Sequence, residues 1–147
     1  EIFFFFFIFG ALHPLSSGTS HSAQYAVAGV MKAVNDGTYN YRDDVLEYGE
    51  KAKLMKDAFT SNGFKFTYDE DLGEPIADGF YFTYYYPGFT GAELLEKMLY
   101  YGISAISLDT CGSTRQGIRA CTSLIQRDEI PVLAERLKRF AEDHPIK

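Results

Sequence analysis

The sequence predicts an α+β fold in which helices pack on one face of a small, mostly antiparallel sheet of three to four strands. Three observations lead to this prediction. Apolar residues recur every three or four positions in several segments, alternate with polar residues from Phe64 to Tyr68, and gather with aromatic residues from Gly79 to Tyr86. A nucleotide-binding βαβ unit is not expected, because Gly112 and Gly117 form no glycine-rich phosphate turn.

Composition and charge narrow the class of protein. The chain has 147 residues, of which 46% are apolar and 23% are charged, which is typical of a globular domain and argues against disorder. Fourteen basic and twenty acidic residues give a net charge of −6, and no stretch concentrates lysine and arginine. Binding to nucleic acid, which requires such a basic stripe, is therefore not expected.

Cysteine and histidine give no sign of a metal site. Cys111 and Cys121 lack the CxxC spacing of a redox pair or a zinc knuckle, which favours a reduced, cytoplasmic protein. The three histidines, His13, His21 and His144, are scattered and none is paired at the i, i+4 spacing. No metal ligand is predicted.

The chain begins with an unusually apolar run, from Ile2 to Phe9. It follows an acidic residue, is shorter than the ~20 residues that span a bilayer, and precedes no Ala-x-Ala-like cleavage site, so neither a signal peptide nor a membrane span is expected. A run this apolar should be covered by a larger upstream domain or a second subunit. Residues 1–22 are therefore predicted to be the remnant of an interface, and residues 23–147 a domain; the lack of an initiating methionine suggests that natural residues precede Glu1.

Two helices and a strand are expected in the first half of the domain. Residues 13–22 are loop-like in composition, and Ser20 or Ser22 could cap a helix that follows from Gln24 to Val34. A longer helix follows Tyr39, with its apolar stripe from Val45 to Phe59 and a glycine stop at Asn62-Gly63. The strand from Phe64 to Tyr68 comes next, and residues 69–78 are acidic and turn-rich.

The second half carries the remaining strands. Thr90 and Glu93 form a capping box for a helix that ends near Tyr101. Strands are expected at 79–86, 103–108 and 117–124, with a polar loop at 109–116. A final helix should start near Asp128 and accept Pro131 in its first turn.

Arg119 is the strongest functional candidate. Side chains alternate along a strand, so Ile118, Ala120 and Thr122 should share one face, and Arg119, Cys121 and Ser123 the other. A structural role would place the guanidinium in an ion pair or direct it to water. A functional role would use its planar fork for two parallel hydrogen bonds to a carboxylate, which lysine cannot make.

The segment from Gly79 to Thr122 is expected to form an aromatic strand, a capped helix and two strands, with Arg119 in the second of these two. This order resembles the C-terminal small domain of class I/II, fold-type-I aminotransferases that depend on pyridoxal phosphate. The resemblance extends over most of the chain. It implies that Arg119 binds the α-carboxylate of amino acid and 2-oxo acid substrates, and that the enzyme is a homodimer. It also places Ser17, Thr19 and Ser20 near the cofactor phosphate of the neighbouring subunit, although each of these could equally be a loop or cap residue.

The same resemblance indicates what this chain lacks. The family's Schiff-base lysine, the acidic partner of the pyridine nitrogen and the phosphate cup all precede the matched region, and the lysines present here are not in the family's Ser-x-x-Lys type of context. We interpret these lysines as solvated surface residues. The chain alone is therefore expected to be inactive and to contribute no catalytic residue, with the cofactor held by a missing N-terminal large domain.

Departures from the family pattern leave alternatives open. Cys111-Gly112 stands where a Phe-Gly or similar pair is common, and no arginine or lysine between His13 and Ser22 is present to bind a second substrate carboxylate. A lyase or decarboxylase of the same fold would use the same arginine. A non-enzymatic module that binds an amino acid or a protein partner is the other alternative.

Overall fold

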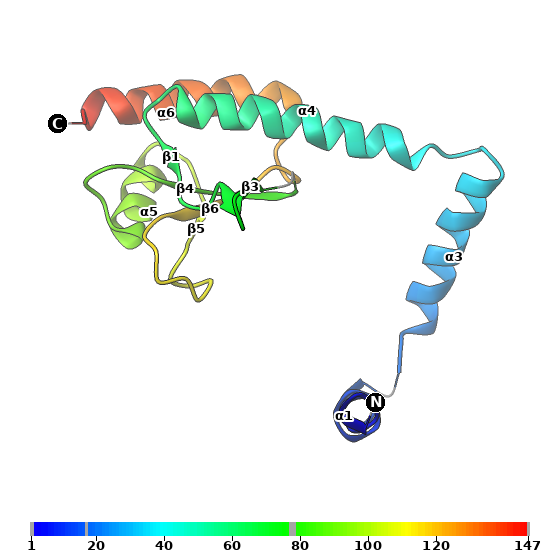
Figure 1. Ribbon diagram of the computed structural model, residues 1–147. Coiled ribbons are helices and arrows are strands. Elements are labelled where there is room, and N and C mark those ends of the chain that lie inside the picture. The colour runs from blue at the N-terminus through cyan, green and yellow to red at the C-terminus, as the bar shows by residue number, and fades with distance from the viewer. Residues whose placement is uncertain (1, 17, 77–78, 147) are drawn as a thin grey trace. The chain divides into compact units, whose positions relative to one another are not determined.

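The computed structural model describes residues 2–16, 18–76 and 79–146 (Figure 1). By its internal contacts the chain divides into two compact units, residues 1–43 and 44–147. The division of the sequence into an interface segment at 1–22 and a domain at 23–147 stays a prediction.

The N-terminal unit consists of helices. Its elements are α1 (Ile2–Phe7), the π-helical turn η1 (Ile8–Leu12), α2 (His13–Ser16) and α3 (His21–Asn35). The predicted loop at 13–22 is therefore wrong over residues 13–16 and 21–22, which are helical. The amide of His13 donates to the carbonyl of Ile8, and this wider turn lets the helix pass Pro14, which has no amide to donate.

The side chains of this unit are largely exposed. Phe3 is 83% exposed and Phe7 49%, and neither α1 nor α3 contains a buried residue. Ser20 occupies the N-cap position of α3, but its hydroxyl makes no capping bond and lies 2.9 Å from the Ser22 hydroxyl instead. A serine side-chain cap, as predicted, is therefore not formed.

The sheet of the second unit confirms the predicted fold class. Its four strands, all antiparallel, lie in the order β1 (Lys65–Phe66), β4 (Tyr81–Tyr85), β6 (Ile118–Cys121) and β5 (Ile106–Ser107). The acidic, turn-rich segment forms a separate hairpin of β2 (Glu70–Asp71) and β3 (Glu74–Pro75). The strands are shorter than the sequence suggested, and the shortening of β5 shapes the site described below.

Helices cover the sheet. α4 (Tyr41–Thr60) and α6 (Ile130–Asp143), the latter preceded by the 3₁₀ turn η2 (Arg127–Glu129), run over the same side of it (Figure 1). α5 (Gly91–Tyr100) contacts β5 and β6. The predicted capping box is present: the Glu93 amide donates to the Thr90 hydroxyl at 3.3 Å, and the Thr90 amide donates to the Glu93 carboxylate at 2.9 Å. These bonds from Thr90 lower the pKa of Glu93.

Alternation along the strands decides which side chains enter the core. Tyr84 on β4 stacks on Phe59 of α4 with ring centres 4.2 Å apart. The buried side chains of β4 and β6 on this face are Phe82, Tyr84, Ile118 and Ala120. One lysine departs from the predicted solvated state: Lys51 is buried, and its ammonium donates to the Ile125 carbonyl at 2.9 Å. This bond ties the segment after β6 to α4.

Tyr84 carries a polar atom that the core does not satisfy. Its side chain is 0% exposed, and its hydroxyl has no hydrogen-bond partner in the described part of the chain. Burial also raises the pKa of Tyr84. Because an unpaired buried hydroxyl costs about 1–3 kcal/mol, Tyr84→Phe is expected to raise the free energy of unfolding by about 1 kcal/mol. Chemical denaturation would measure the change, and a loss of stability would show that the hydroxyl has a partner such as a buried water.

Candidate functional site: a pocket at the open edge of strand β6

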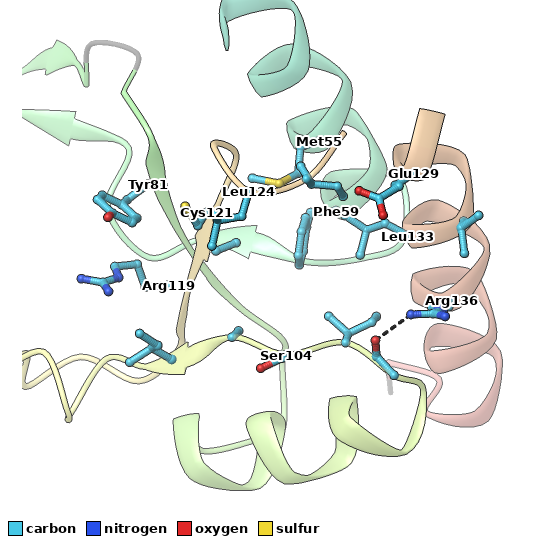
Figure 2. A pocket seen from close by; sticks show the side chains of 17 residues that line it. Met55, Phe59, Tyr81, Ser104, Arg119, Cys121, Leu124, Glu129, Leu133 and Arg136 are labelled. Atoms are coloured by element: carbon cyan, nitrogen blue, oxygen red, sulfur yellow. Dashed lines mark hydrogen bonds between the residues drawn. The ribbon is translucent and has the colours of Figure 1, made fainter. Parts of the chain in front are cut away.

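A pocket forms where two strands separate. β5 pairs with β6 at Ile106↔Arg119 and Ser107↔Ile118, and the pairing goes no further toward residue 102. Between the diverging segments lies a pocket of about 720 Å³ (Figure 2). The residues that line it come from α4, β4, η2, α6 and the segments on either side of the gap: Met55, Phe59, Tyr81, Gly102, Ile103, Ser104, Ala105, Ile106, Arg119, Ala120, Cys121, Leu124, Ile125, Glu129, Val132, Leu133 and Arg136.

Arg119 lies on the outer face of β6, as the alternation predicted. Its guanidinium carbon is 4.5 Å from the centre of the Tyr81 ring, and the two side chains lie at one side of the pocket in Figure 2. Within the described residues, no carboxylate pairs with it and no acceptor takes its hydrogen bonds. This distinguishes Arg119 from Arg115, which donates to the Thr67 carbonyl at 2.8 Å and lies over the Tyr68 ring.

The other two charged residues of the pocket, Glu129 and Arg136, are hydrogen-bonded to backbone groups. The Gln126 amide donates to the Glu129 carboxylate at 2.7 Å. Arg136 donates to the Gly102 carbonyl at 2.7 Å, the bond drawn as a dashed line in Figure 2. Arg119 is thus the charged group of this pocket whose hydrogen-bond donors have no acceptor in the described part of the chain.

Cys121 shares the outer face with Arg119 and lines the same pocket. Burial raises the pKa of its thiol. The Ser123 hydroxyl at 3.1 Å, the amides of Ser123 and Leu124 and the charge of Arg119 act in the opposite direction, and the net effect is a lowered pKa. Both Cys121 and Cys111 are free thiols.

Sequence reasoning found Arg119 but missed its neighbours in space. Tyr81 faces the same side of the sheet because it lies opposite Cys121 in the β4–β6 register. Its place in the aromatic strand was visible in the sequence, but its exposure and the register were not. Glu129 and Arg136 come from the final helix and its first turn, and nothing in their spacing indicated a pocket.

The residues predicted to lie near the cofactor phosphate of the neighbouring subunit, Ser17, Thr19 and Ser20, belong to the N-terminal unit. Ser17 falls outside the described residues. Thr19 and Ser20 are exposed, and the Thr19 carbonyl accepts a bond from the Gln24 side chain at 3.1 Å. Their role toward a cofactor stays a prediction.

The described residues provide neither a metal-binding cluster nor a membrane-spanning helix. None of their histidine, cysteine and carboxylate side chains gather in groups of three or more that could hold a metal ion. Nor is any helix among them both long and apolar enough to cross a bilayer.

Comparison with known proteins shows a partial likeness to a solved structure. No family model matches the chain, and no curated protein matches it. Among solved structures it is similar to the aminotransferase Aro9 from C. Albicans, solved with ligands, with 19% identity and a TM-score of 0.46 over 67% of this chain. The match covers 24% of the Aro9 chain. It assigns neither a substrate nor a residue role to the present protein.

Proposed function

We propose that this chain is the C-terminal domain of a pyridoxal-phosphate-dependent aminotransferase, and that Arg119 binds the α-carboxylate of the amino acid and 2-oxo acid substrates. The observation that carries the proposal is the state of Arg119. It lines a pocket, it is held over Tyr81, and no carboxylate or hydrogen-bond acceptor takes its donors within the described residues. The resemblance of residues 79–122 to the family's small domain supports the same role.

The geometry of Arg119 suits a carboxylate. An aromatic ring attracts a guanidinium that lies over its face. The N–H groups of the guanidinium lie in the guanidinium plane and stay free to donate. Two of them can make parallel, charge-assisted bonds to the two oxygens of one carboxylate. Such a pair fixes the orientation of the substrate as well as its affinity.

The residues present do not fit the cofactor itself. Pyridoxal phosphate supplies the electron sink for amino-group transfer and is held by a lysine in the enzymes that use it. The pocket that contains Arg119 is lined by two basic residues, Arg119 and Arg136, and by no lysine. We therefore assign the cofactor site to a large domain upstream, and to this chain the binding of the substrate carboxylate. The exposed phenylalanines of α1 are the surface we propose for contact with that domain or with the second subunit of a homodimer.

Tyr81 should position Arg119. Because a cation–π contact at a partly exposed site contributes about 0.5–1 kcal/mol, Tyr81→Ala is expected to weaken 2-oxo acid binding about two- to fivefold. Tyr81→Phe keeps the ring and should restore the wild-type value. Inhibition constants for a 2-oxo acid, measured with the longer natural protein, would check both variants. Equal weakening by phenylalanine and alanine would contradict a role for the ring.

The function itself is tested by an amino-transfer assay on the longer natural protein that contains this chain. Supplied with pyridoxal phosphate, an amino acid and a 2-oxo acid, that protein should form the new amino acid, whereas the 147-residue chain alone should form none. Release of carbon dioxide or elimination without amino transfer would replace the aminotransferase with a decarboxylase or lyase. A longer protein that neither binds the cofactor nor turns over would favour a non-enzymatic binding module.

A further inference from the structure

We propose that the pocket beside Arg119 binds the apolar part of its ligand, so that the preferred ligands are monocarboxylates with an aromatic or branched aliphatic side chain. This inference rests on the proposed role of Arg119 as the carboxylate-binding residue. It adds the substrate class, which neither the resemblance nor the comparisons provide.

The charges of the pocket allow one carboxylate. Glu129 accepts a bond from the Gln126 amide, and one N–H group of Arg136 donates to the Gly102 carbonyl, but both side chains keep their charges. Arg136 lies at the opposite side of the pocket from Arg119 (Figure 2). A second carboxylate on a ligand held at Arg119 would enter a mainly apolar pocket that also has the Glu129 carboxylate in its wall, so its desolvation would be costly.

The remaining wall is apolar. The side chains contributed by α4, by α6 and by the segments on either side of the gap are mainly hydrocarbon: Met55, Phe59, Ile103, Ile106, Leu124, Ile125, Val132 and Leu133. Figure 2 shows Arg119 and Tyr81 at one side of the pocket and Leu133 and Arg136 at the other. Apolar walls with a few oriented polar groups are the usual build of small-molecule sites, and a volume of about 720 Å³ is within their range.

The register explains why a ligand could extend from Arg119 into this wall. Ile106 lies opposite Arg119, and the neighbouring pocket residues are Ala105, just before β5, and Ala120 on β6. Both alanines are small, so the side chains next to the Ile106–Arg119 pair do not fill the gap. A carboxylate bonded to Arg119 can therefore carry a side chain that reaches Phe59 and Leu133.

The experiment measures binding to the 147-residue chain by NMR titration, without cofactor or turnover. The probes share one 2-oxo acid group and differ in side chain: phenylpyruvate, pyruvate and oxaloacetate. Phenylpyruvate should bind at least roughly tenfold more tightly than either of the others, because its ring removes apolar surface from water. 3-Phenylpropanamide, which has the ring but no carboxylate, should bind more weakly than phenylpyruvate.

Three variants locate the contacts. Leu124 lines the pocket and is 84% exposed, so Leu124→Asn should keep the fold and reduce the preference for phenylpyruvate over pyruvate roughly threefold or more. Arg119→Gln should weaken all three acids roughly ten- to a hundredfold. Arg139→Gln, which alters an exposed arginine outside this pocket, should change none of them.

The outcomes separate the two proposals. Equal affinities for the three acids, all lost in Arg119→Gln, would overturn the apolar preference and leave the carboxylate role intact. Unchanged binding in Arg119→Gln would overturn the carboxylate role and the inference that rests on it. Failure of phenylpyruvate to bind at millimolar concentration, with the chain folded by circular dichroism, would also overturn the inference.

Discussion

Replacing Arg119 with glutamine is expected to lower kcat/KM for the amino acid substrate by roughly a hundredfold or more in the longer enzyme that we propose contains this chain. Glutamine keeps a hydrogen-bond donor of similar reach but removes the charge and the planar fork, and hydrogen bonds to charged groups contribute about 1.5–3 kcal/mol each. Arg119→Lys keeps the charge without the fork, so its loss should be intermediate. Steady-state kinetics with one amino acid and one 2-oxo acid would measure both variants.

The control for this experiment is an arginine that plays no part in the pocket. Arg139 is exposed and pairs with Glu135 on the same helix, so Arg139→Gln should leave kcat/KM unchanged. The free energy of unfolding should change little in either variant, because Arg119 makes no ion pair among the described residues. A structural role would give the reverse: a stability loss in Arg119→Gln with kinetic constants near those of the wild type.

Gly117→Ala is expected to destabilise the domain by about 3 kcal/mol or more. Gly117 precedes β6 with φ at +143°, and a Cβ there would lie 2.5 Å from the Tyr84 carbonyl oxygen and 2.6 Å from the Thr67 hydroxyl. The Tyr84 carbonyl oxygen belongs to the backbone of β4, so it cannot move away as a flexible side chain would. The strain should reach Arg119, two residues further along β6.

Gly112 offers a matched control, because it also has positive φ, at +81°, but a Cβ there would meet open space. Gly112→Ala should therefore cost about 1 kcal/mol, the backbone term alone. Denaturant unfolding of the two variants, followed by circular dichroism, would give the difference due to crowding. Equal losses in the two variants would show that the close approach of Gly117 to β4 is absent in solution.

Much of the fold could be predicted because local chemistry determines it. The capping box at Thr90 and Glu93 and the proline in the first turn of α6 are short-range signals, and both are present in the structure. The alternation along β6 correctly placed Ile118 and Ala120 inside and Arg119 on the outer face. These features depend on a few neighbouring residues and not on the rest of the chain.

The site was predictable only in part because it depends on pairing between distant segments. The expected strand at 103–108 pairs only over Ile106–Ser107, and the gap that remains is the pocket. No residue type at 103–105 indicates where the pairing ends. The contact of Tyr81 with Arg119 depends on the β4–β6 register, which the sequence pattern leaves undetermined. The helix at residues 13–16 was missed because Pro14 and the serines that follow it are typical of a loop.

The central claim is that this chain supplies the carboxylate-binding part of a pyridoxal-phosphate enzyme and that the cofactor is held elsewhere. The most direct test is an absorbance titration with pyridoxal phosphate, made once with the longer protein that we propose contains this chain and once with the 147-residue chain alone. We expect the visible band of protein-bound cofactor to appear with the longer protein and to be absent with the chain alone. If the band appears with neither, the assignment to this enzyme class is wrong.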